Sequence, residues 1–148
     1  MTAKQYLSQI RHLDTRINQR IREKELLQEE ALSTGAIRYD KDRVQTSPSG
    51  TSRQLLLTEK AADMELEITR MIDRFVGLKH KIIGQIQQLP DERFMRVLFE
   101  RYVNYKSFEQ IAVEMSYTYK WICDLHGMAL NAFDAAFLKQ HEQTGIDP

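Results

Sequence analysis

Hydrophobic positions recur at helical spacing over the first thirty residues of the chain. Between residues 2 and 31 the apolar side chains step by three and four positions, and the early ones are Tyr6, Ile10, Leu13, Ile17 and Ile21. This spacing places them on one face of a helix. Thr2 stands where a helix N-cap is expected. The pattern therefore predicts one long amphipathic helix over residues 2–31.

The periodicity is lost over residues 33–53, where Gly, Pro and Ser gather. Such a composition is typical of a loop, and a loop of this length in a small protein is commonly functional or disordered. We predict a polar, flexible connection here. The alternative is a segment that binds a partner through Ile37, Tyr39 and Val44.

Residues 54–89 show the strongest repeat in the chain. The apolar positions step by three and four over about four heptads, which is close to a coiled-coil seam. They are Ala61, Met64, Ile68, Met71, Phe75, Leu78, Ile82, Ile86 and Leu89. A second set, Leu66, Ile72, Val76 and Ile83, widens the apolar surface. Two long helices with one apolar face each predict an antiparallel hairpin over residues 1–89. The extra apolar surface is expected to pack on the C-terminal helices or on a second subunit, and Met71, Phe75 and Ile82 are the candidate interface residues.

Three shorter helices are predicted after Pro90. The first covers about 91–103 and the second starts at Ser107, whose pairing with Gln110 forms an S-x-x-Q capping box. The third is capped by Thr118 and runs to about His141. We predict a unit over 90–141 and a frayed tail over 142–148. The whole chain is thus expected to be all-α.

The helix at 107–115, the short turn and the helix from Thr118 have the spacing of a helix-turn-helix, in which the second helix enters the DNA major groove. The segment from Leu89 to Phe133 contains four short motifs, which are Leu89-Pro90, Arg101-Tyr102, Ser107-Phe108-Glu109-Gln110-Ile111-Ala112 and Leu125-His126. In these motifs the segment resembles sigma-70 region 4, the part of bacterial sigma factors that contacts the −35 promoter element.

The chain as a whole is similar to Gram-positive prophage proteins of the ArpU and RinA type, which regulate late transcription in phages. That similarity rests on Tyr6-Leu7, Ile10-Arg11, Leu13-Asp14, Asp42-Arg43-Val44-Gln45 and Leu125-His126-Gly127 with Ala129-Leu130. It implies a transcription regulator in the bacterial cytoplasm that binds double-stranded DNA, with RNA polymerase or another phage or host protein as a further partner. We also expect a homodimer.

The charge distribution limits this interpretation. The 148 residues carry 21 basic and 21 acidic side chains, so the chain as a whole has no net attraction for nucleic acid. The helix from Thr118 offers few cations. The predicted base contacts are Thr118, Tyr119, Lys120, Asp124 and Asn131, and the predicted phosphate contacts are Arg96, Arg101 and Lys106. Arg93 is an alternative phosphate contact.

Two other function classes therefore stay open. The last helix could contact a protein through Trp121 and Met128, or these side chains could simply pack in the core. A DNA-packaging recognition subunit, similar to a small terminase, also joins a helix-turn-helix to an oligomerising coil. A ring larger than a dimer would favour that third class.

Catalytic and metal chemistry are not expected. The four histidines are scattered, the glycines are isolated, and the single cysteine, Cys123, excludes a multi-thiolate zinc site. We expect His126 to be a hydrogen-bonded histidine at the edge of the helical core. No cofactor is predicted, and no apolar run is long enough to cross a membrane.

Overall fold

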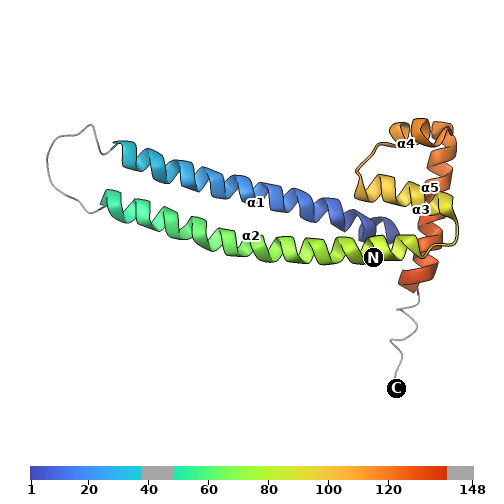
Figure 1. Ribbon diagram of the computed structural model, residues 1–148, viewed down its shortest axis with the longest axis horizontal. Coiled ribbons are helices and arrows are strands. Elements are labelled where there is room, and N and C mark those ends of the chain that lie inside the picture. The colour runs from blue at the N-terminus through green and yellow to red at the C-terminus, as the bar shows by residue number, and fades with distance from the viewer. Residues whose placement is uncertain (38–48, 140–148) are drawn as a thin grey trace, which may run out of the picture. The chain divides into compact units, whose positions relative to one another are not determined.

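The computed structural model describes residues 1–37 and 49–139, and every regular element among them is helical (Figure 1). In chain order the elements are α1 (Ala3–Ile37), α2 (Ser49–Gln87), α3 (Glu92–Leu98), η1 (Phe99–Val103), α4 (Phe108–Met115), α5 (Tyr119–Phe133) and η2 (Asp134–Leu138). The prediction of an all-α protein is confirmed. Within the described ranges, no helix combines the length and apolar character that a membrane span requires.

The two long helices exceed their predicted lengths. The first continues past Ala31 to Ile37, and the second begins at Ser49 rather than at residue 54. The predicted loop over 33–53 is therefore wrong at both ends. Gly and Ser weaken a helix by only about 1 kcal/mol each relative to Ala, so a helix that is already formed can continue through them. The middle of that loop, with Tyr39 and Val44, and the predicted tail over 142–148 lie outside the described residues.

The described chain falls into two compact units, and their division runs through both long helices. The first unit consists of residues 1–13 and 75–148, and the second consists of residues 14–74. The division therefore does not coincide with the sequence boundary that we expected at Pro90.

In the second unit the two long helices lie side by side in opposite directions. Arg20 pairs with Glu67 at 3.3 Å, and Glu30, further along α1, pairs with Arg53, earlier in α2. Both pairs are exposed, so each contributes at most about 1 kcal/mol. The stabilising contact is the apolar seam between the helices, whose buried residues are Ile17, Ala31, Leu57, Ala61 and Ile68.

The first unit has a larger core that joins segments far apart in the sequence. The start of α1, the end of α2, α3, η1 and α5 all contribute buried side chains to it. Its buried members are Ala3, Leu7, Ile10, Ile82, Ile86, Leu89, Leu98, Tyr102, Val103, Ala129 and Phe133. The phenol of Tyr6 donates to Oε1 of Gln85 at 2.8 Å, which ties the first turns of α1 to α2.

A second cluster in this unit joins α3, α4 and α5. Its buried residues are Val97, Ile111, Ala112, Ile122 and Leu125, and Phe94, Phe108 and Met115 pack against it. The small side chain of Ala112 allows α4 and α5 to approach closely.

Two helical segments have π geometry, which the sequence pattern did not predict. In η1 the backbone N–H of Asn104 donates to the carbonyl of Phe99 at 3.2 Å, which is an i→i+5 bond. The wider turn lets the neighbouring residues Tyr102 and Val103 both face the core. The second such segment, η2, continues α5 to Leu138.

Ser116 ends α4 in the left-handed conformation, with φ 58° and ψ 39°. A residue with a Cβ pays about 1 kcal/mol or more for this geometry, whereas glycine does not. We predict that Ser116→Gly raises the free energy of unfolding by about 0.5–1 kcal/mol. Urea unfolding followed by circular dichroism measures the change.

Ser116→Ala is the matched control because it keeps the Cβ. Alanine should leave the free energy of unfolding within about 0.5 kcal/mol of the parent. Equal stability of the glycine and alanine variants would contradict the prediction.

Candidate functional site

The candidate site is the surface formed by α4, the turn after it and the first turns of α5. Ser107 and Gln110 form the predicted capping box, in which the Gln110 backbone N–H donates to Ser107 Oγ at 3.3 Å. The Gln110 side chain accepts from the Ser107 backbone N–H at 3.1 Å. Thr118 caps α5 and accepts from the Trp121 backbone N–H at 3.1 Å. Both sequence-predicted helix starts are confirmed.

The two faces of α5 differ sharply. Ile122, Leu125, Ala129 and Phe133 are fully buried against the rest of the unit. The opposite face carries Tyr119, Lys120, Asp124, Gly127 and Asn131, all of them exposed. This arrangement leaves one side of the helix available to a partner.

Four of the five predicted base-contacting residues lie together at the start of α5. Thr118, Tyr119, Lys120 and Asp124 occupy the cap and the first two turns. Lys120 and Asp124 form no ion pair with any residue of the described ranges. The Cys123 thiol beside Tyr119 raises the pKa of that phenol.

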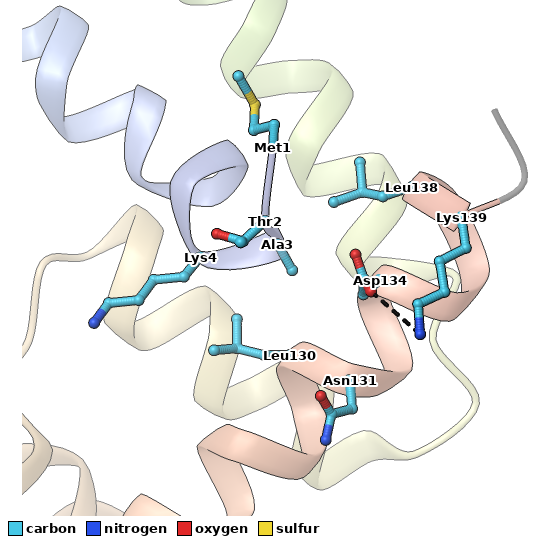
Figure 2. Close-up of a pocket in the computed structure, with 9 residues that line it drawn as sticks. All are labelled: Met1, Thr2, Ala3, Lys4, Leu130, Asn131, Asp134, Leu138 and Lys139. Atoms are coloured by element: carbon cyan, nitrogen blue, oxygen red, sulfur yellow. Dashed lines mark ion pairs between the residues drawn. The ribbon is translucent and has the colours of Figure 1, made fainter. Parts of the chain in front are cut away.

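Asn131 lies elsewhere, eleven residues beyond Lys120. At 1.5 Å per residue this is roughly 16 Å along the helix. Its side chain lines an open groove of about 440 Å³ between the end of α5, η2 and the first residues of α1 (Figure 2). Asp134 and Lys139 form an ion pair at 3.6 Å on the same groove. The structure therefore does not bring Asn131 together with the other four.

Two of the three predicted phosphate contacts are engaged within the chain. The Arg101 guanidinium donates to the Lys106 carbonyl at 3.0 Å and lies 4.3 Å from the ring centroid of Phe108. The Lys106 ammonium lies 2.7 Å from a Glu100 carboxylate oxygen and 2.8 Å from one of Glu114. These two carboxylates raise the pKa of Lys106 and neutralise its charge locally.

Arg96, the third predicted contact, is exposed on α3. It forms no close ion pair with a described residue, although its charge contributes to lowering the pKa of Glu100. Arg93, the alternative, is held by Asp91 at 3.1 Å. Lys120 and Arg96 are thus the cations of this surface that remain open to a phosphate.

His126 faces inward between Tyr102 and Phe108, as expected for a hydrogen-bonded core-edge histidine. Its Nε2 lies 2.7 Å from the Tyr102 hydroxyl, and its ring contacts Phe108 edge-on at 4.9 Å between centroids. Burial lowers the pKa of His126 to about 4, and Arg101 adds to the shift. Burial also raises the pKa of Tyr102 to about 12. The pair is neutral near pH 7.

The residues predicted to contact proteins fall into two groups. Trp121 and Met128 remain 37% and 40% exposed, so neither is buried in the core. Met71 and Phe75 are half-buried, whereas Ile82 is fully buried against this chain's own residues. Ile82 is therefore not accessible to a partner, because α1 and the C-terminal helices already cover it.

Sequence reasoning missed two exposed apolar residues of the α4–α5 surface, Tyr117 and Val113. Tyr117 contacts Trp121 edge-on at 6.4 Å between ring centroids, and Val113 is exposed on α4. Val113 lies among the apolar residues of α4, so its hydrophobicity alone did not distinguish it from core residues. Its place on the outer side of α4 could have been found from the helical angle between Ile111 and Val113.

No family model, no curated protein and no solved structure matches this chain. In the described part of the chain, no three His, Cys, Asp or Glu side chains are placed to hold a metal ion.

The half-buried imidazole of His126 predicts that the stability of the protein depends on pH. The folded-state pKa of His126 is about 4, below its ordinary 6.5. Between pH 6.5 and pH 4 the unfolded chain binds a proton at His126 that the folded chain does not bind. The free energy of unfolding is therefore highest above pH 6.5 and decreases as the pH falls to 4. Because the imidazole is only half-buried, solvent screening reduces the effect, and we predict a loss of about 1–2 kcal/mol in the free energy of unfolding.

His126→Gln should flatten this dependence between pH 6.5 and 4 while lowering stability at neutral pH, because packing on Tyr102 and Phe108 is lost. Denaturant unfolding at several pH values measures both effects. His12→Gln, at an exposed histidine of α1, is the control and should keep the parent slope. The same slope in His126→Gln would show that another group is responsible.

Proposed function

We propose that this chain is a transcription regulator that binds DNA through α4, the turn at residues 116–118 and α5, used as a helix-turn-helix. In this proposal α1 and α2 form a helical hairpin ahead of a sigma-like unit. The protein acts by positioning and recruitment, with RNA polymerase as a candidate protein partner. It needs no cofactor and carries out no catalysis.

The observation that carries the proposal is the capped, exposed start of α5. A recognition helix must present its first turns to base edges while the helix before it braces the fold. Here Thr118 fixes the first turn, and Tyr119, Lys120 and Asp124 project from it. Ile122 and Leu125 hold the other face against α4 and α3.

The proposed DNA contacts follow from the available side chains. Lys120 and Arg96 contact phosphates, and Asp124 accepts from a cytosine amino group in the major groove. Arg101 and Lys106 are not among the proposed phosphate contacts. The Arg101 guanidinium already packs on Phe108, and the Lys106 ammonium is already paired with Glu100 and Glu114. Asn131 is left out because of its distance along α5.

Such a surface predicts weak DNA binding. From Phe108 to Phe133 the chain has one lysine, Lys120, and three carboxylates, Glu109, Glu114 and Asp124. Two phosphate contacts per chain give a slope of about −2 in a plot of log affinity against log salt, since each contact contributes about 0.9. High local concentration or a protein partner would be needed to stabilise the complex.

A second candidate function is favoured by the aromatic residues beside the cation-poor face. Tyr117, Trp121 and Met128 are exposed, and such side chains are enriched at the centres of protein interfaces. In this alternative α5 contacts a host or phage protein and no DNA. The two functions place their main contacts on different side chains, so single substitutions separate them.

DNA binding is tested by fluorescence anisotropy with duplex fragments at low and moderate salt. We predict that Lys120→Ala and Arg96→Ala each reduce affinity several-fold and each make the salt slope shallower by about 0.9. Asp124→Lys should raise non-specific affinity, because it replaces a repulsive charge beside the phosphates with an attractive one, and should remove the preference for cytosine that the Asp124 contact provides.

Arg101→Ala tests the structural role of that residue and should lower stability more than it changes the salt slope. Lys24→Ala, at a half-buried lysine of α1, is the matched charge control and should change neither property. Absence of binding at low salt in the parent and in Asp124→Lys would reject the DNA proposal. The protein-contact alternative would then be supported if a pull-down with Trp121→Ala, but not with Lys120→Ala or Arg96→Ala, no longer recovered a protein that binds the parent.

A further inference from the structure

The outer face of α2 in the second unit carries an exposed leucine and an unusual order of charges. Leu66 is 61% exposed, although α1 covers the other side of α2 through Leu57, Ala61 and Ile68. Next to Leu66 on the same side lie Glu59, Asp63, Arg70 and Arg74, all of them exposed. At 3.6 residues per turn, these four fall within about 60° of one another around the helix.

None of these four charges has a partner among the described residues. Some other charges of the unit are paired, since Arg20 pairs with Glu67, Arg22 with Glu25 and Glu29, and Arg53 with Glu30. Lys60, Glu65 and Asp73 of α2 are also exposed and form no ion pair with a described residue. The row of Glu59, Asp63, Arg70 and Arg74 is therefore distinguished by its order of signs and not by being unpaired.

The order of signs along the row is acidic, acidic, basic, basic. A second copy of α2 running in the opposite direction brings Glu59 beside Arg74 and Asp63 beside Arg70, with the symmetry axis between Leu66 and Glu67. Both pairs of residue numbers have the same midpoint, so one alignment of the two helices forms both ion pairs. Two-fold symmetry repeats each pair, which gives four ion pairs in the dimer. Leu66 of one copy then meets Leu66 of the other at the axis.

We propose that this face of α2, defined by Leu66 with Glu59, Asp63, Arg70 and Arg74, binds a second copy of this chain in an antiparallel, two-fold symmetric contact. A parallel arrangement in register would place like charges opposite each other, which is unfavourable. The symmetric contact uses the same patch on both copies, as isologous dimers do. The proposal does not depend on DNA binding.

The proposed contact has a small apolar centre, because the side chains beside Leu66 on this face of α2 are those of Ala62 and Thr69. Stable interfaces usually bury about 800 Å² on each partner, and one helix face of this length gives less. The dimer should therefore dissociate in the micromolar range and weaken as salt screens the ion pairs.

A charge-swap experiment tests the register directly. One variant carries Arg70→Glu and Arg74→Glu, and the other carries Glu59→Lys and Asp63→Lys. Each alone should be monomeric in sedimentation velocity at concentrations where the parent is dimeric, because its row then has one sign. An equimolar mixture should regain the dimer, since the two rows attract each other. Circular dichroism of each variant checks that the helices remain folded.

Cross-linking provides a second measurement. In a Cys123→Ser background, Leu66→Cys should form a disulfide-linked dimer under mild oxidation, because the two positions meet at the axis. Asn18→Cys, at an exposed position of α1, is the control and should cross-link at least tenfold more slowly.

The outcomes are decisive in each case. A monomeric parent at the highest soluble concentration overturns the proposal, and so does a dimer that both charge variants retain. Two monomeric variants that fail to combine would show that the charges do not face each other in this register. A loss of DNA binding without a change in the dimer would bear only on the proposed function.

Discussion

The fold of the first unit depends on the burial of one ring, that of Phe133. This side chain has no exposed surface, and it is contacted by Tyr6 from the start of α1 and by Phe137 from η2, at centroid distances of 5.9 and 5.0 Å. Leu7, Ile10, Ile82 and Ile86 complete the surrounding core. Segments separated by more than a hundred residues are joined there. A buried aromatic ring of this kind stabilises a core by several kcal/mol, so the C-terminal helices and the first turns of α1 are expected to fold together.

This packing also organises the candidate site. Because Phe133 and Ala129 fix the inner side of α5, its outer side is determined along its whole length. Tyr102 is hydrogen-bonded to His126, and the His126 ring packs on Phe108. The Arg101 guanidinium lies over the Phe108 ring. The Arg101 side chain thus packs within the fold and does not offer its charge to the surface. The charge that the site offers to a ligand is smaller than a count of nearby basic residues suggests.

Much of the fold followed from the sequence because short-range chemistry specified it. The caps at Ser107 and Thr118 and the proline after Leu89 each require only neighbouring residues. The ends of α1 and α2 did not follow, because helix continuation through Gly and Ser depends on the helix already present. The π turns, the pairing of Lys106 with two carboxylates and the separation of Asn131 from Lys120 depend on tertiary packing. Residue type alone therefore assigned Arg101 and Lys106 roles that their contacts within the chain do not leave open.

The π geometry of η1 fixes the length of the segment that contains it. An i→i+5 turn holds one more residue than an α-helical turn, and here the extra residue allows Tyr102 and Val103 to share the core. Deleting any one residue between Phe99 and Val103 would restore ordinary helical winding and rotate one of these two side chains toward water. The hydroxyl of Tyr102 would then leave Nε2 of His126. Among related sequences, substitutions in this segment should accordingly be far more frequent than insertions or deletions.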